Sequence, residues 1–346
     1  MKFLKSIIII GLVIILNSYS VDAKKEGKYI WKMADVVPGG VGYASFVDKV
    51  FVPKIIEVTQ GEVNQDWYHG SIMGDEEDYL AKMRINQLHG SIMSVGGTLM
   101  VCPEMSVLQL PFLFNDLKEV KYVREKMRKI FSDIVKKNGF KTLIMADQDF
   151  DQIYSTKYQM NTSADFIKSK FVAHAGFVEF KILKALGVSP IPLGVPEVAS
   201  ATRSGVIDTC ICPSLWTLGT QLYTVNKYVN TLKWRYSPGM VILSSKVWDN
   251  LPEKHQKAID AVLPEMEERF NVMSANDNKK ALKAMINYGL KEVKMSTKQI
   301  NDFKNKLLPV WDDLSGKKFP VELLDEVKMH LKQYRSEQSK NTYRKI

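Results

Sequence analysis

The sequence predicts an α/β protein divided into two lobes, and three observations lead to this prediction. Segments typical of strands alternate with amphipathic helical segments, an order that produces mostly parallel sheets covered by helices. The chain has 346 residues, more than one hydrophobic core usually organises. Beyond residue 252 nearly all of the sequence has helical spacing, so we expect long helices to complete the fold at the C-terminal end.

The first half of the chain contains a β-α-β-α-β order. Asp35 directly follows the first expected strand, and Ser94 lies in the third. Ligands of parallel sheets bind where loops leave the carboxyl ends of the strands, so both residues are candidate site residues. The expected strands are 29–34, 63–68 and 90–95, and the expected helices are 42–58 and 74–85.

The same alternation resumes in the second half. Two of its strands, 229–232 and 239–244, are expected to carry the chain back to the first lobe, and a helix follows from Glu253 to about Glu292. The other expected helices are 118–138, 177–186 and 196–204, and the other expected strands are 141–146, 171–173, 191–193 and 206–212.

The N-terminus predicts export. Lys2 and Lys5 precede a ten-residue apolar run, 7–16, and Val21-Asp22-Ala23 has the small-residue pattern of a cleavage site. The run is too short to cross a hydrocarbon layer of roughly 30 Å as a helix. We therefore expect a signal peptide over residues 1–23, cleaved after Ala23, and a periplasmic protein. The alternative is an uncleaved N-terminal anchor.

Composition excludes several partners. The formal net charge is +10, but the lysines are scattered among acidic residues, so we expect a solvated surface and no nucleic-acid partner. Three cysteines, Cys102, Cys210 and Cys212, are an odd number for a disulfide framework. Cys210 and Cys212 lack further ligand residues nearby, so no metal is expected.

No catalytic motif is present. The five histidines do not form H-E-x-x-H, and the sequence has no P-loop, no G-x-G-x-x-G and no G-x-S-x-G. We therefore expect neither an enzyme nor a cofactor. An exported enzyme that uses Asp151 and His174 as acid and base is the competing interpretation.

A series of short motifs, in order over residues 29–262, resembles the solute receptors of TRAP transporters, the DctP-like family. Each motif is weak alone, but their shared order is specific. They are 51–63 (FVPKIIEVTQGEV), 74–80 (GDEEDYL), 110–114 (LPFLF), 184–188 (KALGV), 197–198 (EV), 205–208 (GVID), 223–228 (YTVNKY), 236–238 (YSP) and 248–252 (WDNLP).

This resemblance implies a two-lobed periplasmic binding protein, type II-like, that captures a small molecule for a TRAP-type membrane permease. It implies a first lobe of residues 24–147 and 236–277, and a second of 148–235 and 278–346. A monomer is expected. The alternative is a stand-alone carrier or sensor partner for an apolar or lipid-like compound.

The departures from the family pattern concern the ligand. The resemblance places Val172 and Asp151 where relatives usually carry arginines, Cys212 where an asparagine is frequent, and Ser94 at a polar position of the first lobe. A shift of one or two residues would bring Ala173 or His174 to the position of Val172.

Without those arginines a buried carboxylate ligand would lack a partner, so we expect a ligand that is not a simple carboxylate. His174 can offer a hydrogen bond or a titratable charge. Ordinary core packing is the alternative role of each expected wall residue of the site. These wall residues are Tyr154, Leu183, Trp216 and Trp234.

Overall fold

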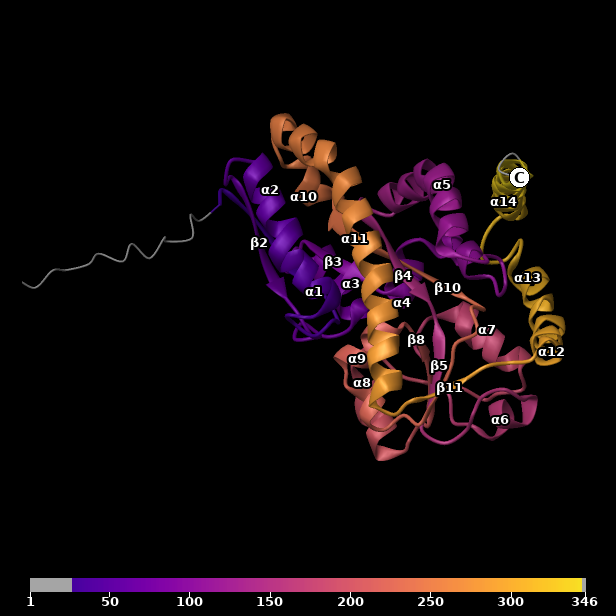
Figure 1. Cartoon of the computed structure of the whole chain (residues 1–346). Coiled ribbons are helices and arrows are strands. Elements are labelled where there is room, and N and C mark those ends of the chain that lie inside the picture. Colours follow the sequence, from indigo (N-terminus) through magenta and orange to yellow (C-terminus); the bar gives the residue numbers. More distant parts are fainter. Residues whose placement is uncertain (1–26, 344–346) are drawn as a thin grey trace, which may run out of the picture.

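The computed structural model describes residues 27–343, which form two α/β lobes side by side (Figure 1). The predicted signal peptide lies outside these residues. Most predicted strands and helices are confirmed, and the two-lobed α/β architecture with long C-terminal helices is confirmed as well.

The first lobe is built on a five-stranded sheet in the order β2-β1-β3-β10-β4. Strand β1 pairs in parallel with β2 and β3, whereas β10 runs antiparallel to both of its neighbours. The sheet is thus parallel except for the strand that returns from the second half of the chain. The strands are β1 (Tyr29–Ala34), β2 (Val63–Tyr68), β3 (Gly90–Met93), β4 (Phe140–Phe150) and β10 (Tyr236–Ser244).

Helices surround this sheet, and helix α1 continues directly into the π-helical turn η1. The 36-residue helix described below packs against β4. The other helical elements of the lobe are α1 (Gly42–Phe46), η1 (Val47–Phe51), α2 (Val52–Val58), α3 (Glu76–Arg84), α4 (Val95–Val101), η2 (Pro103–Gln109), α5 (Leu117–Lys137) and α10 (Ser245–Asp249).

The second lobe contains a four-stranded sheet in the order β11-β9-β5-β8 and a two-stranded sheet of β6 and β7. Its strands are β5 (Gln152–Ser155), β6 (Val172–Ala173), β7 (Ile191–Pro192), β8 (Thr209–Cys212), β9 (Tyr228–Asn230) and β11 (Lys291–Val293). Its helical elements are α6 (Ser163–Lys168), α7 (Phe177–Ala185), α8 (Val195–Ser204), α9 (Ser214–Gly219) and η3 (Leu222–Thr224).

Two of the crossings that the chain makes between the lobes lie at nearly the same place. Strand β4 continues through Asp151 into β5, and β9 returns through residues 231–235 into β10. The Asp151 backbone N–H donates to the Arg235 carbonyl at 3.0 Å, so the two crossing segments lie side by side.

Helix α11 (Glu253–Tyr288) runs along both lobes (Figure 1). Strand β4 is at the edge of its sheet, so its outer backbone groups have no strand partner. Buried side chains of α11 take that place. Glu267 accepts from the Met145 N–H at 2.8 Å, Asn271 accepts from the Asp147 N–H at 2.7 Å, and Asn271 also donates to the Met145 carbonyl at 3.1 Å.

The same face of α11 continues into the second lobe. Ser274 donates to the Asp147 carbonyl at 2.5 Å. One turn later, Asn278 accepts from the Leu215 N–H of α9 at 2.8 Å. We call Glu267, Asn271, Ser274 and Asn278 the polar stripe; their spacing of four, three and four residues places them on one face of the helix.

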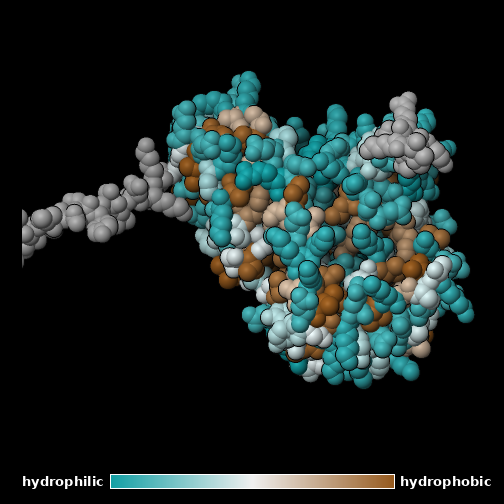
Figure 2. Space-filling view, in the orientation of Figure 1, coloured by the Kyte–Doolittle hydropathy of each residue, from teal (hydrophilic) through white to brown (hydrophobic). Residues whose placement is uncertain are grey.

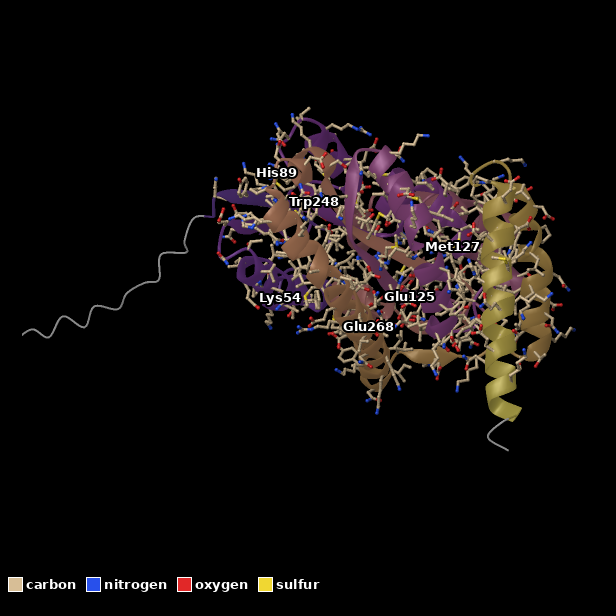
Figure 3. The ribbon with its side chains drawn as sticks, turned by 90° about the horizontal axis from the view of Figure 1, so that it is seen from above. Lys54, His89, Glu125, Met127, Trp248 and Glu268 are labelled. Atoms are coloured by element: carbon tan, nitrogen blue, oxygen red, sulfur yellow. The ribbon has the colours of Figure 1, made fainter. Side chains whose placement is uncertain are left out.

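Helices α12 (Thr297–Leu307), α13 (Pro309–Leu314) and α14 (Val321–Tyr343) complete the chain. Helix α14 packs mainly against α5, whereas α12 and α13 contact α7. The predicted lobe boundaries assign 278–346 to the second lobe and stay a prediction. Figure 3 shows Glu125 of α5 and Glu268 of α11 on facing helices, and Lys121 contacts both carboxylates, at 4.0 and 2.8 Å.

The structure differs from the sequence prediction in several elements, which include the unpredicted helices α6 and α9. Helix α11 ends at Tyr288 and not near Glu292, because Gly289 has a φ of 129°, which glycine alone adopts readily. Strand β5 was not predicted. Helix α4 was not predicted either, because it begins Val95-Gly96-Gly97 and glycine is a weak helix former.

Figure 2 shows a face dominated by hydrophilic residues, with apolar residues in separate small patches. Between residues 27 and 343 no helix combines the length and apolar character needed to cross a membrane.

The polar stripe predicts the effect of Asn271→Ala. The substitution leaves the Asp147 N–H and the Met145 carbonyl buried without partners, at a cost of roughly 1–3 kcal/mol each. We expect the free energy of unfolding in urea to fall by about 2–4 kcal/mol. Asn276→Ala, on the exposed face of the same helix, should change it by less than about 0.5 kcal/mol. Equal effects of the two substitutions would contradict the role of the stripe.

Candidate ligand-binding site

A cavity of about 50 Å³, counted as the space open to the centres of water molecules, lies between the lobes. The first lobe contributes the loop after β1 and the start of α4. The second lobe contributes the loop after β6, the end of β8 and helix α9. Most of the wall is apolar and includes Val37, Tyr43, Val95, Val195, Ile211 and Trp216. The polar lining residues are Ser94, Gln148, Asp151, His174, Cys212 and Arg235.

The structure brings half of the predicted site residues together at this cavity. These are Ser94, Asp151, His174, Cys212 and Trp216. That any of them contacts a ligand stays a prediction.

The other predicted residues are buried away from the cavity. Tyr154 and Val172 belong to the apolar core of the second lobe, and the Tyr154 hydroxyl donates to Ser214 at 2.8 Å. Leu183 and Trp234 pack in the main core, and Asp35 lies beneath the loop that forms part of the wall. Two residues beyond Val172, it is the His174 side chain that reaches the cavity.

Arg235 is the main residue that sequence reasoning missed. Its guanidinium is buried, with Nε 2.8 Å and Nη2 2.6 Å from Asp151, and with Nη2 also 3.4 Å from Glu179 of α7. Nη1 is buried without a hydrogen-bond partner among the described residues. The signal in the sequence was a single arginine between two aromatic residues, Trp234 and Tyr236, in an otherwise lysine-rich chain.

A carboxylate of the protein occupies the N-terminus of α4. Glu76 Oε2 accepts from the Ser94 hydroxyl at 2.7 Å and from the Gly97 N–H at 3.0 Å, and Oε1 accepts from the Ser94 N–H. A helix N-terminus attracts negative charge because its N–H groups lack partners. Burial nevertheless raises the pKa of Glu76 to about 7.

His174 and Trp216 form an aromatic part of the wall. Their rings stack with centroids 6.1 Å apart at an angle of 19°. The His174 backbone N–H donates to Glu179 at 3.0 Å, but its Nδ1 is buried without a hydrogen-bond partner among residues 27–343. Nδ1 lies 3.9 Å from the Glu179 carboxylate, too far for a hydrogen bond, so it can still donate to a ligand.

Cys212 presents a neutral thiol to the cavity. Its Sγ lies 3.1 Å from the Thr217 hydroxyl and 3.8 Å from the Cys210 Sγ, and burial raises the pKa of the thiol. A disulfide requires about 2.05 Å between sulfurs, so both cysteines are free. No cluster of three metal-ligand side chains occurs within the described part of the chain.

Asp35 fixes the loop that carries Val37. One carboxylate oxygen accepts from the Val37 N–H at 2.9 Å, and the other lies 2.6 Å from His69 Nδ1. His69 Nε2 is 3.2 Å from Asp48, and Trp67 stacks on the imidazole. Hydrogen bonding to Asp35 raises the pKa of His69 from 6.5 to about 9. The histidine is therefore a cation that orders one wall of the cavity.

Two α/β lobes joined by paired crossings, with a cavity between them, define a periplasmic binding protein fold. The model of the bacterial extracellular solute-binding protein family 7, DctP, matches residues 41–318. The chain belongs to this family, whose members bind small molecules in the periplasm and work with the membrane components of TRAP transporters.

Known relatives share the fold at low sequence identity. The C4-dicarboxylate-binding periplasmic protein DctP of Rhodobacter capsulatus is 23% identical over 292 residues, 83% of this chain and 86% of the relative. A TRAP solute-binding protein of Sulfurospirillum deleyianum with bound succinate has a TM-score of 0.81 at 22% identity, with 87% of this chain and 99% of that one covered. The sugar acid binding protein DctPAm of Advenella mimigardefordensis, in complex with galactonate, has a TM-score of 0.83 at 19% identity, with 89% and 99% covered.

The pair of His69 and Asp35 predicts a pH dependence of stability. The pKa of His69 is raised in the folded state, so its stabilisation is complete below pH 6.5 and is lost as the pH rises through about 9. We expect the free energy of unfolding to fall over this range and the His69→Gln variant to have a flatter profile. Asp48→Asn keeps the Asp35 contact and should retain most of the dependence. Superimposable slopes for His69→Gln and the unsubstituted protein would refute this assignment.

Proposed function

We propose that this protein is the periplasmic receptor of a TRAP-type transporter for a compact, uncharged and largely apolar solute with one hydrogen-bond acceptor. The observation that carries the proposal is that the strong anion-binding groups around the cavity already bind carboxylates of the protein itself. A simple carboxylate would meet these carboxylates and find few free donors.

The charge at Arg235 supports this ligand class. In the receptors that the sequence resembles, an arginine holds the carboxylate of the ligand. Here Arg235 is shared by Asp151 and Glu179, so these three groups carry a net charge of −1 when ionised. An incoming anion would add a like charge to a buried site, which is unfavourable without a further cation.

In the first lobe, the N-terminus of α4 is a second anion-binding group that already binds a carboxylate of the protein. Its donors are engaged by Glu76. The backbone N–H groups of His174 and Ala175 are likewise engaged by Glu179, at 3.0 and 2.7 Å. Three sites that could each attract an anion are thus occupied.

The unpaired hydrogen-bond donors and the apolar wall of the cavity indicate which kind of ligand would fit. His174 Nδ1, which lies 3.9 Å from Glu179, and Arg235 Nη1 lack hydrogen-bond partners among the described residues, so each can donate to an acceptor oxygen of the ligand. The rest of the wall is apolar. A single water needs roughly 10–15 Å³ of such space, so a cavity of about 50 Å³ has room for a small molecule.

The transport assignment includes export after cleavage at Ala23 and action as a monomer. A stand-alone carrier for an apolar compound is the second candidate, favoured by the apolar wall. A turnover role receives no support from the geometry, because Asp151 is bound to Arg235 and Ser237 and not to His174.

Ligand binding tests this function directly. Material released from the freshly purified, signal-free protein on denaturation should contain a small neutral compound identifiable by mass spectrometry. In a thermal-shift panel, small ketones, amides and alcohols should include a compound that raises the melting temperature by roughly 5 °C at a hundredfold excess over its Kd. Stabilisation by succinate, erythronate or galactonate alone would refute the proposed ligand class and leave an organic-acid receptor.

His174→Phe tests the polar end of the site. The substitution keeps a ring to stack on Trp216 but removes the free imidazole nitrogen. We expect the affinity for the ligand found in the panel to fall about tenfold, the usual effect of losing one hydrogen bond, with little change in melting temperature. His330→Phe, on α14, is the matched control, measured by calorimetric titration. Unchanged affinity in His174→Phe would exclude the imidazole as the donor.

A further inference from the structure

A single carboxylate connects the two lobes at the rim of the cavity. Asp75 of the first lobe is the N-cap of α3, and its Oδ1 accepts from the Glu76 N–H at 2.8 Å. Its Oδ2 accepts from the Val195 N–H at 3.2 Å, at the first residue of α8 in the second lobe. Val195 also lines the cavity. One side chain thus caps two helices that belong to different lobes.

The contact across the lobes is favourable for a physical reason. The first N–H groups of α8 have no partner within the helix, and the positive end of its dipole faces Asp75. The next residue, Pro196, has no N–H, and the Gly194 N–H is bound by Glu197 at 2.8 Å. Val195 is therefore the donor of this turn that remains for Asp75.

Gly194 makes the close approach possible. A Cβ built on this residue would lie 2.5 Å from Asp75 Oδ2, well inside van der Waals contact. The Gly194 backbone, with φ −67° and ψ 155°, is accessible to any residue. The local conformation would accept a side chain at this position, but the Asp75 carboxylate of the opposite lobe would have to move away from it.

We infer that Asp75, Gly194 and Val195 form a closing contact that holds the lobes together over the cavity and so sets the affinity for the solute. The inference rests on the proposed function, because closure matters only if a solute binds between the lobes. Asp75 is a positioning residue: it reaches the start of α8 and stabilises the closed arrangement.

Three substitutions separate the closing contact from local stability. Asp75→Ser keeps a good N-cap for α3 but removes the oxygen that reaches Val195. Gly194→Ala leaves α8 intact and forces Asp75 away. In the double variant the serine hydroxyl takes about the place of the Asp75 Cγ, which is 3.6 Å from the new Cβ, so the clash is relieved. Glu77→Ser, an exposed acid in the same turn of α3, is the matched control.

We expect the losses of ligand affinity in the two single variants not to add up in the double variant. Each single variant should weaken binding of the panel ligand about tenfold, as for loss of one charge-assisted hydrogen bond. The double variant should be no weaker than Asp75→Ser alone, because both changes remove the same contact. Glu77→Ser should bind like the unsubstituted protein. Additive losses, or equal losses in Asp75→Ser and Glu77→Ser, would overturn the inference.

A distance measurement tests closure without a ligand. Labels attached at Ala81→Cys on α3 and Ser200→Cys on α8 lie on exposed residues of opposite lobes, and the three native cysteines are buried. In the purified protein without added ligand, Asp75→Ser and Gly194→Ala should lengthen the mean distance between the labels relative to Glu77→Ser. An unchanged distance would overturn the closing contact. If no compound of the panel binds, the proposed ligand class fails, and the label distances still decide for or against the contact.

Discussion

Helix α11 binds the unpaired edge of strand β4 and also contacts the second lobe, so both lobes pack on the same helix. A sheet edge presents unpaired N–H and C=O groups, and burying them without partners would be costly. The polar stripe of α11 supplies these partners with side chains, at Met145 and Asp147, and then reaches α9 of the second lobe through Asn278. One helix therefore satisfies the first sheet and sets the position of the second lobe. The paired crossings beside β4 and the cavity between the lobes depend on that arrangement.

The charges of the site are organised around the same crossings. Asp151 and Arg235 lie on the two crossing segments, and their ion pair reaches Glu179 on α7. An arginine is thus present in the cavity, as in a receptor for organic acids, but its charge is balanced from within the protein. The relatives with bound succinate and galactonate share the fold. Glu76 accepts hydrogen bonds at the N-terminus of α4 and Asp151 binds Arg235, and the proposal that the ligand is not a simple carboxylate depends on these two contacts.

The sequence predicted the fold well because the spacing of apolar residues and the glycines and prolines that end helices and strands are local signals. Helix 42–58 and helix 118–138 were visible from their apolar periodicity, and the resemblance of ordered motifs gave the architecture. The contents of the site were harder to predict. Arg235 comes from a segment far from Asp151 in sequence, and no local pattern reveals which lysine or arginine will be buried. Val172 was placed by counting, whereas strand β6 turns its side chain into the core and brings His174 to the cavity. The polar stripe was missed for the same reason, since Asn271 looks like any exposed residue of a long helix.

The three cysteine thiols of this protein determine whether folding depends on disulfide formation. All three cysteines are buried and free, and Cys210 and Cys212, the pair in contact, keep their sulfurs 3.8 Å apart. Folding of the chain therefore requires no oxidation step and no disulfide isomerase. Because the three cysteines are buried, oxidants in the surrounding solution meet no exposed thiol.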